Sequence, residues 1–135
     1  MSSGPVIDRV NPDTMHRPSG YTHVVIATGG KSVFIAGQVA LDTDGNLIGE
    51  GDVAAQAEQV FTNLTAALAA VGGTFANVVK ITVFLTDMSH ITTVRDIRNR
   101  YVDTANPPAS TAVEVVALAR PEWLIEVEAI AVVAA

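Results

Sequence analysis

Two glutamates near the C-terminus have the type and the spacing that acid–base chemistry needs. Glu126 and Glu128 alternate with apolar residues in the segment 124–133, and residues two apart on a strand face the same side. Two carboxylates on one face either reach solvent or line a cleft, where a carboxylate can hold and activate a water molecule. Glu114, in the segment before them, either shares that face or pairs with an arginine.

Two arginines, a tyrosine and a glycine are the other candidates for a ligand site. Arg95 in a predicted helix and Arg120 beside the last predicted strand are candidate anion binders, or else surface or salt-bridge arginines. Tyr21 either packs or offers its hydroxyl and ring to a ligand. Gly37 lies inside a predicted strand, where glycine indicates a bulge or a close approach by a ligand or backbone.

Several other kinds of chemistry have no support in the sequence. The absence of cysteine excludes disulfides, thiol catalysis and cysteine-based metal sites. His16, His23 and His90 have no metal-ligand spacing, so we expect exposed or capping histidines and no metal site. The segment 29–31 (Gly-Gly-Lys) lacks the spacing of a phosphate-binding loop, and no nucleophile-elbow motif surrounds a serine.

The composition bounds the class of protein. Of the 135 residues, 49% are hydrophobic and 16% charged, against a usual charged share of about 25%. The net charge of −6 and the lack of a basic stripe argue against nucleic-acid binding. We find no signal peptide and no apolar run near the roughly 20 residues of a membrane span, so we expect a soluble, cytoplasmic protein. The length fits one domain over residues 1–135.

The hydrophobic periodicity predicts an α+β domain with the element order ββαβαββ. Residues 1–20 are expected to form an irregular N-terminal arm, and segments 23–28 and 32–41 a hairpin across a Gly-Gly-Lys turn. Helices are predicted at 53–71, capped by Asp52, and from Asp87 or Ser89 to before residue 106, and strands at 77–85, 111–118 and 124–133.

The two predicted helices cannot cover both faces of the predicted sheet. Two helices cover one face of a mixed sheet, so the other face needs a different cover. The low charge of the chain also indicates apolar surface that is buried against other copies of the chain.

The C-terminal block PPASTAVEVVALARPEWLIEVEAIAV (107–132) resembles the signature of the RidA/YjgF family, whose members are also described as endoribonuclease L-PSP. Three upstream segments occur in the family's order and spacing: IAGQVALD (35–42), VAAQAEQVFTNL (53–64) and VVKITVFLTD (78–87). The resemblance covers residues 19–133 and implies a chorismate-mutase-like fold with a mixed sheet and two helices on one face. It further implies a homotrimer with a central barrel and ligand clefts between subunits.

The resemblance also implies an activity and a set of site residues. Characterised members hydrolyse reactive enamine/imine intermediates such as 2-aminoacrylate to a 2-keto acid and ammonia, without a metal or an organic cofactor. Tyr21 matches the family's tyrosine after glycine, Gly37 its strand glycine, and Glu126 its water-positioning glutamate. Arg95 stands at the family's helix asparagine.

Ser110 is where the chain departs from the family pattern. Imine-deaminating members have an arginine here that clamps the substrate carboxylate, and loss of its two charged hydrogen bonds would cost about 3–5 kcal/mol. One interpretation is a hydrolase for an intermediate other than 2-aminoacrylate, with Arg95 as the replacement cation. The alternative is a non-deaminating trimeric ligand-binding or regulatory protein. Ribonuclease activity is not expected at a net charge of −6.

Overall fold

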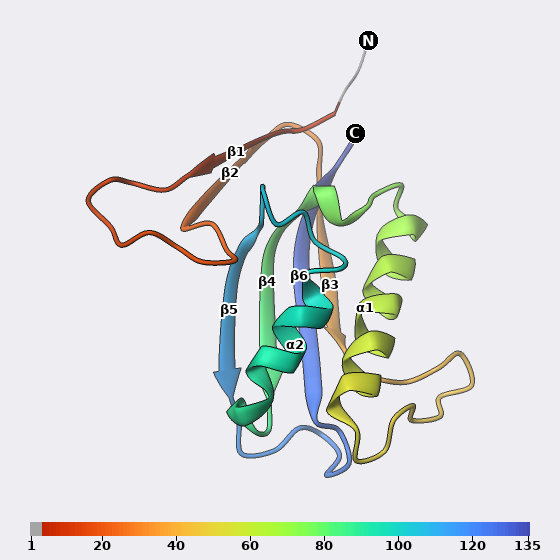
Figure 1. Cartoon of the computed structure of the whole chain (residues 1–135). Helices are drawn as coiled ribbons and strands as arrows, with labels where there is room; N and C mark the ends of the chain where they lie inside the picture. The colour runs from red at the N-terminus through yellow and green to blue at the C-terminus, as the bar shows by residue number, and fades with distance from the viewer. Residues whose placement is uncertain (1–3) are drawn as a thin grey trace.

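The computed structural model describes residues 4–135 as a four-stranded mixed sheet with two helices against one face (Figure 1). The elements in chain order are β1 (Val6–Val10), β2 (Val24–Thr28), β3 (Lys31–Gln38), α1 (Val53–Ala70), β4 (Val78–Leu85), α2 (Ile91–Arg98), β5 (Ala109–Glu114) and β6 (Ile125–Val133). A short 3-10 turn at Phe75–Asn77 comes directly before β4, and another at Met88–His90 comes directly before α2. The predicted α+β fold is confirmed.

The sheet order is β3-β6-β4-β5. β6 pairs antiparallel with both β3 and β4, whereas β5 pairs parallel with β4. In this register Glu126 lies beside Phe84, and Ser110 lies beside Ile81. Ile81 is fully buried under the helices, so its neighbour Ser110 shares the helix-covered face of the sheet.

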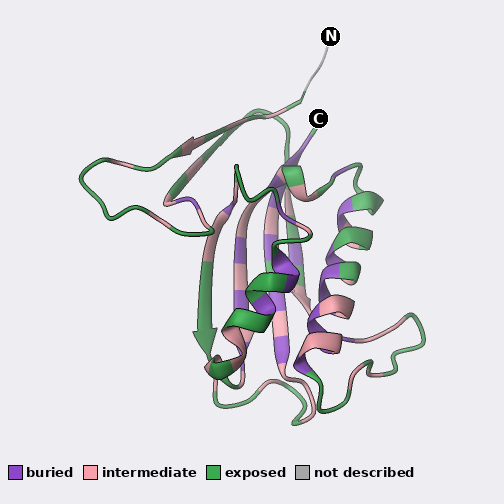
Figure 2. Ribbon diagram, in the orientation of Figure 1, coloured by how far each residue is buried: buried purple, intermediate pink, exposed green. Residues whose placement is uncertain are grey.

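The helix-covered face holds the hydrophobic core. The buried side of α1 repeats every three or four residues, and its members pack on alternate residues of β4 and β6 (Figure 2). Asp52 caps α1 as expected, because its carboxylate accepts a hydrogen bond from the backbone N–H of Ala55 at 3.1 Å. The helix ends at Ala70, and two residues later Gly72 has a φ of 76°, the left-handed conformation that glycine adopts readily.

The N-terminal part of the chain differs from the prediction in two respects. The segment expected to be an irregular arm contains the strand β1, which pairs antiparallel with β2. The expected hairpin between 23–28 and 32–41 is wrong, because β2 pairs with β1 in a separate two-stranded ribbon that projects from the main sheet (Figure 1). The corner at Gly30 explains this: a Cβ there would overlap the carbonyl oxygen of Val133, so the chain turns sharply against the end of β6.

The second helix is also shorter than predicted. Regular α2 ends at Arg98, and turns continue the chain to Val102, whose N–H donates to the carbonyl oxygen of Arg98. Tyr101 still packs against the core as expected, with its ring stacked on Phe61 at a centroid distance of 5.3 Å.

The opposite face of the four-stranded sheet has neither α1 nor α2 against it. Phe34 on β3 projects from this bare face with 76% of its surface exposed. Its neighbour in the register is Ile130 on β6, and alternation along β6 then places Glu128 and Glu126 on the same face.

Candidate functional site

Three of the predicted site residues meet in one hollow on the helix-covered side of the sheet. Tyr21, Arg95 and Ser110 line a hollow of about 100 Å³. Its other lining residues are Ser19, Val83, Ile91, Val94, Arg98 and Ala112. A larger hollow of about 690 Å³ lies between the β1–β2 loop and residues 104–107, and Tyr21 alone of the predicted site residues lines it.

The hollow is built from three separate parts of the chain. Ser110 and Ala112 on β5 form a floor of small side chains beside Ile81 and Val83 of β4. Arg95 comes from α2 across this floor, and the loop before β2 supplies Tyr21. The site therefore depends on the placement of α2 and of the β1–β2 loop relative to β5.

Arg98 is a lining residue that the sequence analysis did not single out. Only 8% of its surface is exposed, and its guanidinium donates through Nε and Nη2 to the side-chain oxygen of Asn99, at 3.3 and 3.1 Å. Burial, together with the charge of the nearby Arg95, lowers the pKa of the Arg98 guanidinium. The spacing of three between Arg95 and Arg98, which puts both on one side of a helix, was the available signal.

Hydrogen bonds fix the loop that carries Tyr21. The hydroxyl of Tyr21 lies 2.8 Å from Nε2 of His16, and Thr22 donates through its backbone N–H to Pro108 and through its hydroxyl to Pro107, at 3.1 and 2.5 Å. Gly20 has a φ of 78°, and a Cβ there would lie 2.8 Å from Nη2 of Arg98. Glycine thus lets the backbone approach the guanidinium closely.

Glu126 and Gly37 meet on the bare face instead. A Cβ on Gly37 would overlap the carboxylate of Glu126, so that carboxylate lies against the Gly37 backbone. The register of β3 against β6 shifts between Ile35 and Gln38. The register shift fits the bulge expected at Gly37, whereas the group that approaches this glycine is the side chain of Glu126 and not a ligand or backbone. Glu128 is exposed on the same face.

The predicted site residues thus form two groups on opposite faces of one sheet. Tyr21, Arg95 and Ser110 share the hollow under α2, whereas Gly37 and Glu126 lie on the other side of β6. The strands themselves separate the two groups, so one copy of the chain does not bring Glu126 to the hollow.

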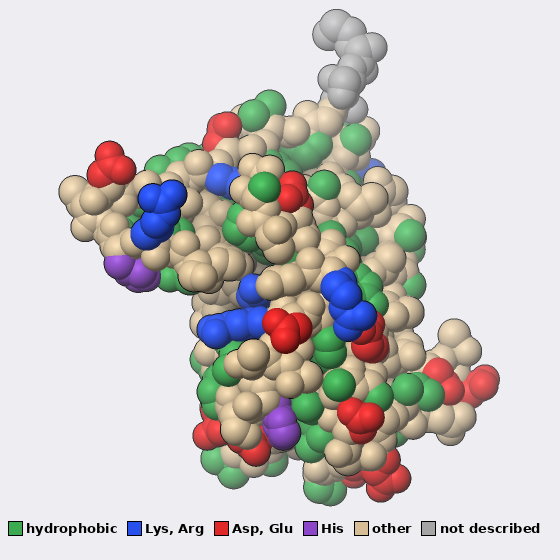
Figure 3. Space-filling view, viewed as in Figure 1, with side chains coloured by type: hydrophobic (Ala, Val, Ile, Leu, Met, Phe, Trp, Pro, Cys, Tyr) green, Lys and Arg blue, Asp and Glu red, His purple; other side chains and the backbone are tan. Residues whose placement is uncertain are grey.

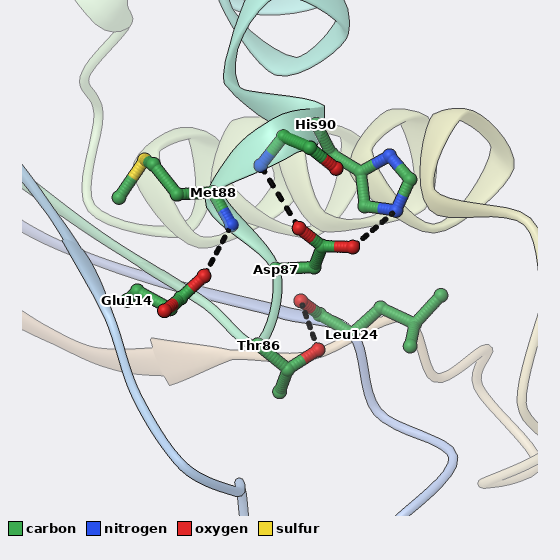
Figure 4. Close-up of polar contacts among 7 residues, drawn as sticks. Thr86, Asp87, Met88, His90, Glu114 and Leu124 are labelled. Atoms are coloured by element: carbon green, nitrogen blue, oxygen red, sulfur yellow. Dashed lines mark hydrogen bonds and ion pairs between the residues drawn. The ribbon is translucent and has the colours of Figure 1, made fainter.

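Glu114 has a structural contact that neither sequence-based alternative included. It neither shares a face with Glu126 nor pairs with an arginine, and its Oε1 accepts a hydrogen bond from the backbone N–H of Met88 at 2.7 Å (Figure 4). Asp87 accepts from the N–H of Ser89 at 2.9 Å, and these hydrogen bonds lower the pKa of Asp87. The two carboxylates hold the turn from which α2 begins, and so position its arginines.

The remaining sequence candidates lie away from the hollow. Arg120 is exposed in the β5–β6 connection and does not line it. His16 and His23 contact each other edge to face in the β1–β2 loop, at a ring-centroid distance of 4.7 Å. Within residues 4–135, no group of three histidine, aspartate or glutamate side chains is arranged to hold a metal ion, and no helix is long and apolar enough to cross a membrane.

Comparison with known proteins defines the class to which this fold and these residues belong. A model of the family described as Endoribonuclease L-PSP matches residues 14–133. Protein DfrA of Myxococcus xanthus is 44% identical over 112 residues, which are 83% of this chain and 84% of DfrA. The 2-iminobutanoate/2-iminopropanoate deaminase of Bos taurus is 38% identical over 102 residues, 76% of this chain and 73% of that protein.

A solved structure gives the same result. YyfB of Yersinia pestis, from the conserved Rid protein family, superposes with a TM-score of 0.82 at 36% identity and covers 94% of this chain and 98% of its own. The chain therefore belongs to the endoribonuclease L-PSP family, which is the RidA/YjgF family that its C-terminal block resembles.

Proposed function

We propose that this protein hydrolyses small reactive enamine/imine acids in a cleft formed between two copies of the chain. The observation that carries the proposal is the separation of Glu126 from the hollow that contains Tyr21, Arg95 and Ser110. A second copy whose bare face meets this hollow supplies the missing carboxylate. Relatives whose names describe imine deaminases support the chemistry.

The exposed apolar surface supports an assembly of this kind. Phe34 is 76% exposed on the bare face, beside Ile130 of β6. Large apolar side chains that project from an uncovered sheet face are typical of surfaces that bind another chain. Because Glu126 lies on that same face, an assembly that buries Phe34 also carries Glu126 toward a neighbouring copy. We propose a homotrimer, as the family resemblance implies.

The proposed reaction assigns each half of the site a step. The hollow binds the acid through its carboxylate and orients the C=N bond. Glu126 of the neighbouring copy accepts a proton from water while the water oxygen attacks the imine carbon and the C=N electron pair moves to nitrogen. The nitrogen takes up this proton, which gives a carbinolamine. The hydroxyl proton then passes through Glu126 to the nitrogen, the C=O bond forms as the C–N bond breaks, and ammonia and a 2-keto acid are released. An enamine enters the sequence after tautomerising to the imine.

Hydrolysis of imines generated in situ tests the proposal. Imino acids of increasing side-chain length are produced by an amino-acid oxidase or lyase, and the rate of their conversion to 2-keto acids is compared with the rate in buffer. We expect acceleration with at least one substrate other than 2-aminoacrylate, together with a trimer mass in analytical ultracentrifugation. Rates equal to buffer across the whole series would contradict the proposal.

A non-deaminating binding protein is the second candidate, and Ser110 is the observation that favours it. The family resemblance places a carboxylate-binding arginine at this position, whereas Ser110 offers a hydroxyl on the floor of the hollow. On this candidate function, the protein binds small carboxylates in the same hollow and leaves imines unchanged. Binding of 2-keto acids without any imine hydrolysis would support it.

A further inference from the structure

The guanidinium of Arg98 is a buried charge without a counter-ion in the described part of the chain. Its residue is 8% exposed, and its hydrogen bonds go to the neutral side chain of Asn99. The ion pairs among residues 4–135 are His90–Asp87 and Arg100–Glu58, so none involves Arg98. Burying an unpaired cation is costly, and proteins normally pair such a charge or use it to bind an anion.

The two hollows that Arg98 lines contain other basic side chains and no acidic ones. Arg95 and Arg98 line the inner hollow of about 100 Å³ and also an adjoining outer hollow of about 360 Å³, which His16 and Arg17 line as well. No aspartate or glutamate is among the lining residues of either hollow. Three of the eight lysines and arginines of a chain with a net charge of −6 therefore line these two hollows, Arg95 and Arg98 from α2 and Arg17 from the β1–β2 loop. Figure 3 shows Lys and Arg side chains on this face of the molecule, both on the projecting loop and below it.

The shape of the inner hollow matches a short acid. Ser110 and Ala112 have small side chains, which leave space between β5 and the two arginines. Val83, Ile91 and Val94 add apolar side chains to the lining. The lining therefore offers guanidiniums to a carboxylate and apolar side chains to a short hydrocarbon chain.

We propose that Arg98, together with Arg95, binds the carboxylate of a small 2-imino or 2-keto acid, so that α2 provides the cations that a strand arginine at position 110 would otherwise supply. The identity of the ligand as the substrate acid rests on the proposed function. The cation site itself rests on burial, on the missing counter-ion and on the hollow, each of which holds for this chain by itself.

A titration with a charged and an uncharged form of one ligand tests the site. The intact protein is titrated with 2-oxobutanoate and with 2-oxobutanamide, and binding is followed by calorimetry or NMR. Each charged hydrogen bond contributes about 1.5–3 kcal/mol, so we expect the amide to bind about 10- to 100-fold more weakly than the acid. Equal binding of the two forms, or no binding of the acid, would overturn the proposal.

Variants locate the binding on α2. Arg98→Met and Arg95→Gln are expected to weaken acid binding by about 10-fold or more and to leave amide binding unchanged. Arg98→Lys keeps the charge but loses the two-pronged geometry, so it should fall between wild type and Arg98→Met. Arg120→Gln removes the same charge outside the hollow and should bind the acid like wild type. Acid affinity unchanged in all three α2 variants would overturn the proposal.

Thermal stability separates a ligand-binding arginine from a structural one. Arg98→Met keeps a long apolar stem and removes an unpaired buried cation, so the free variant should unfold at a temperature equal to or above that of wild type. A lower Tm with unchanged acid affinity would show a structural role and overturn the proposal. If Arg98→Met does not fold, the acid affinities of Arg95→Gln, at an exposed position, and of the conservative variant Arg98→Lys test the carboxylate site instead.

The same variants distinguish this proposal from the proposed function. Acid binding that depends on Arg98 in a protein that does not hydrolyse imines upholds the carboxylate site and contradicts the hydrolase. Imine hydrolysis whose KM is unchanged in Arg98→Met and Arg95→Gln upholds the hydrolase and contradicts the carboxylate site.

Discussion

The two faces of the four-stranded sheet carry opposite halves of the candidate chemistry. The helix-covered face gathers Arg95 and Arg98 around a hollow whose lining contains no carboxylate. The bare face presents Glu126, held against the backbone of Gly37. If both groups shared one face of one copy, the arginines and the glutamate would neutralise each other. Their separation keeps the cations and the carboxylate unpaired within one copy of the chain.

Replacing Glu126 should produce the largest effect, because it removes the base from the bare face. Glu126→Gln is expected to lower kcat for imine hydrolysis by about 100- to 10,000-fold, the usual contribution of a general base, while acid binding in the hollow persists. Steady-state kinetics and the 2-oxobutanoate titration measure the two halves separately. Glu128→Gln, two residues away on the same face, is the matched control and should retain wild-type rates.

Mixing two impaired variants, assayed at substrate concentrations well below KM, tests whether the halves come from different copies. Glu126→Gln lacks the carboxylate half and Arg98→Met lacks the cation half, and an interface in a mixed oligomer can combine the intact half of each. Equal mixing after reversible dissociation should restore about a quarter of the wild-type activity, since one interface in four then pairs two intact halves. Activity that stays at the level of the separate variants would show that both halves act within one copy.

Filling the hollow from β5 should weaken the helix-covered half. Ser110→Arg adds a third guanidinium to the lining that contains Arg95 and Arg98, and its volume fills space that the ligand needs. We expect acid affinity to fall about 10-fold or more, the size of one charged hydrogen bond. Ser110→Ala should bind the acid nearly as well as wild type. An increase in affinity for Ser110→Arg would contradict this expectation and show that the hollow accommodates a third guanidinium together with the acid.

A methyl group at Gly37 should disturb the bare face alone. In Gly37→Ala the new Cβ overlaps the Glu126 carboxylate and forces it to move. Overpacking of this kind destabilises by about 1–3 kcal/mol. We expect kcat to fall by about 10-fold as the carboxylate is misplaced, with unchanged acid binding in the hollow. Ala36→Ser, at the exposed neighbouring position, controls for general damage to β3.

The smallest effect concerns the turn that positions α2. Hydrogen bonds from Ser89 hold the pKa of Asp87 below its ordinary value of 3.8. Asp87 therefore contributes to stability above pH 3.8, and that contribution disappears as the pH falls through the lowered pKa. In Asp87→Asn the Tm should decline less steeply with acid than in wild type. Asp96→Asn, an exposed carboxylate on α2, should follow the wild-type curve more closely.

Local patterns in the sequence predicted most of the fold. The stripe of apolar residues in α1, with Asp52 before it and Gly72 after it, specifies a helix without reference to the rest of the chain. The pairing of β2 with β1 was missed because a strand's partner depends on long-range geometry. Here that geometry is the corner at Gly30, where the chain packs against β6.

The candidate site was only partly predictable, because it too depends on long-range geometry. Alternation in the last strand indicated that Glu126 and Glu128 share a face, and the family resemblance singled out Tyr21, Gly37 and Ser110. The separation of these residues onto opposite faces depends on the register of β5 against β4, which no local pattern gives. Arg98 was missed because its sequence neighbours do not show that its guanidinium is buried without a carboxylate.

The ribbon of β1 and β2 has a consequence for how the protein can diverge. Tyr21 reaches the hollow on a loop outside the packed core, joined to the start of β5 through the hydrogen bonds of Thr22 to Pro107 and Pro108. Insertions or exchanges in that loop would reshape the ligand site and leave the buried interior intact. Glu126, near the start of the central strand β6 and paired in register with Phe84 of β4, has no such freedom. Changes in the loop can thus alter the lining of the hollow while the carboxylate of Glu126 stays where it is.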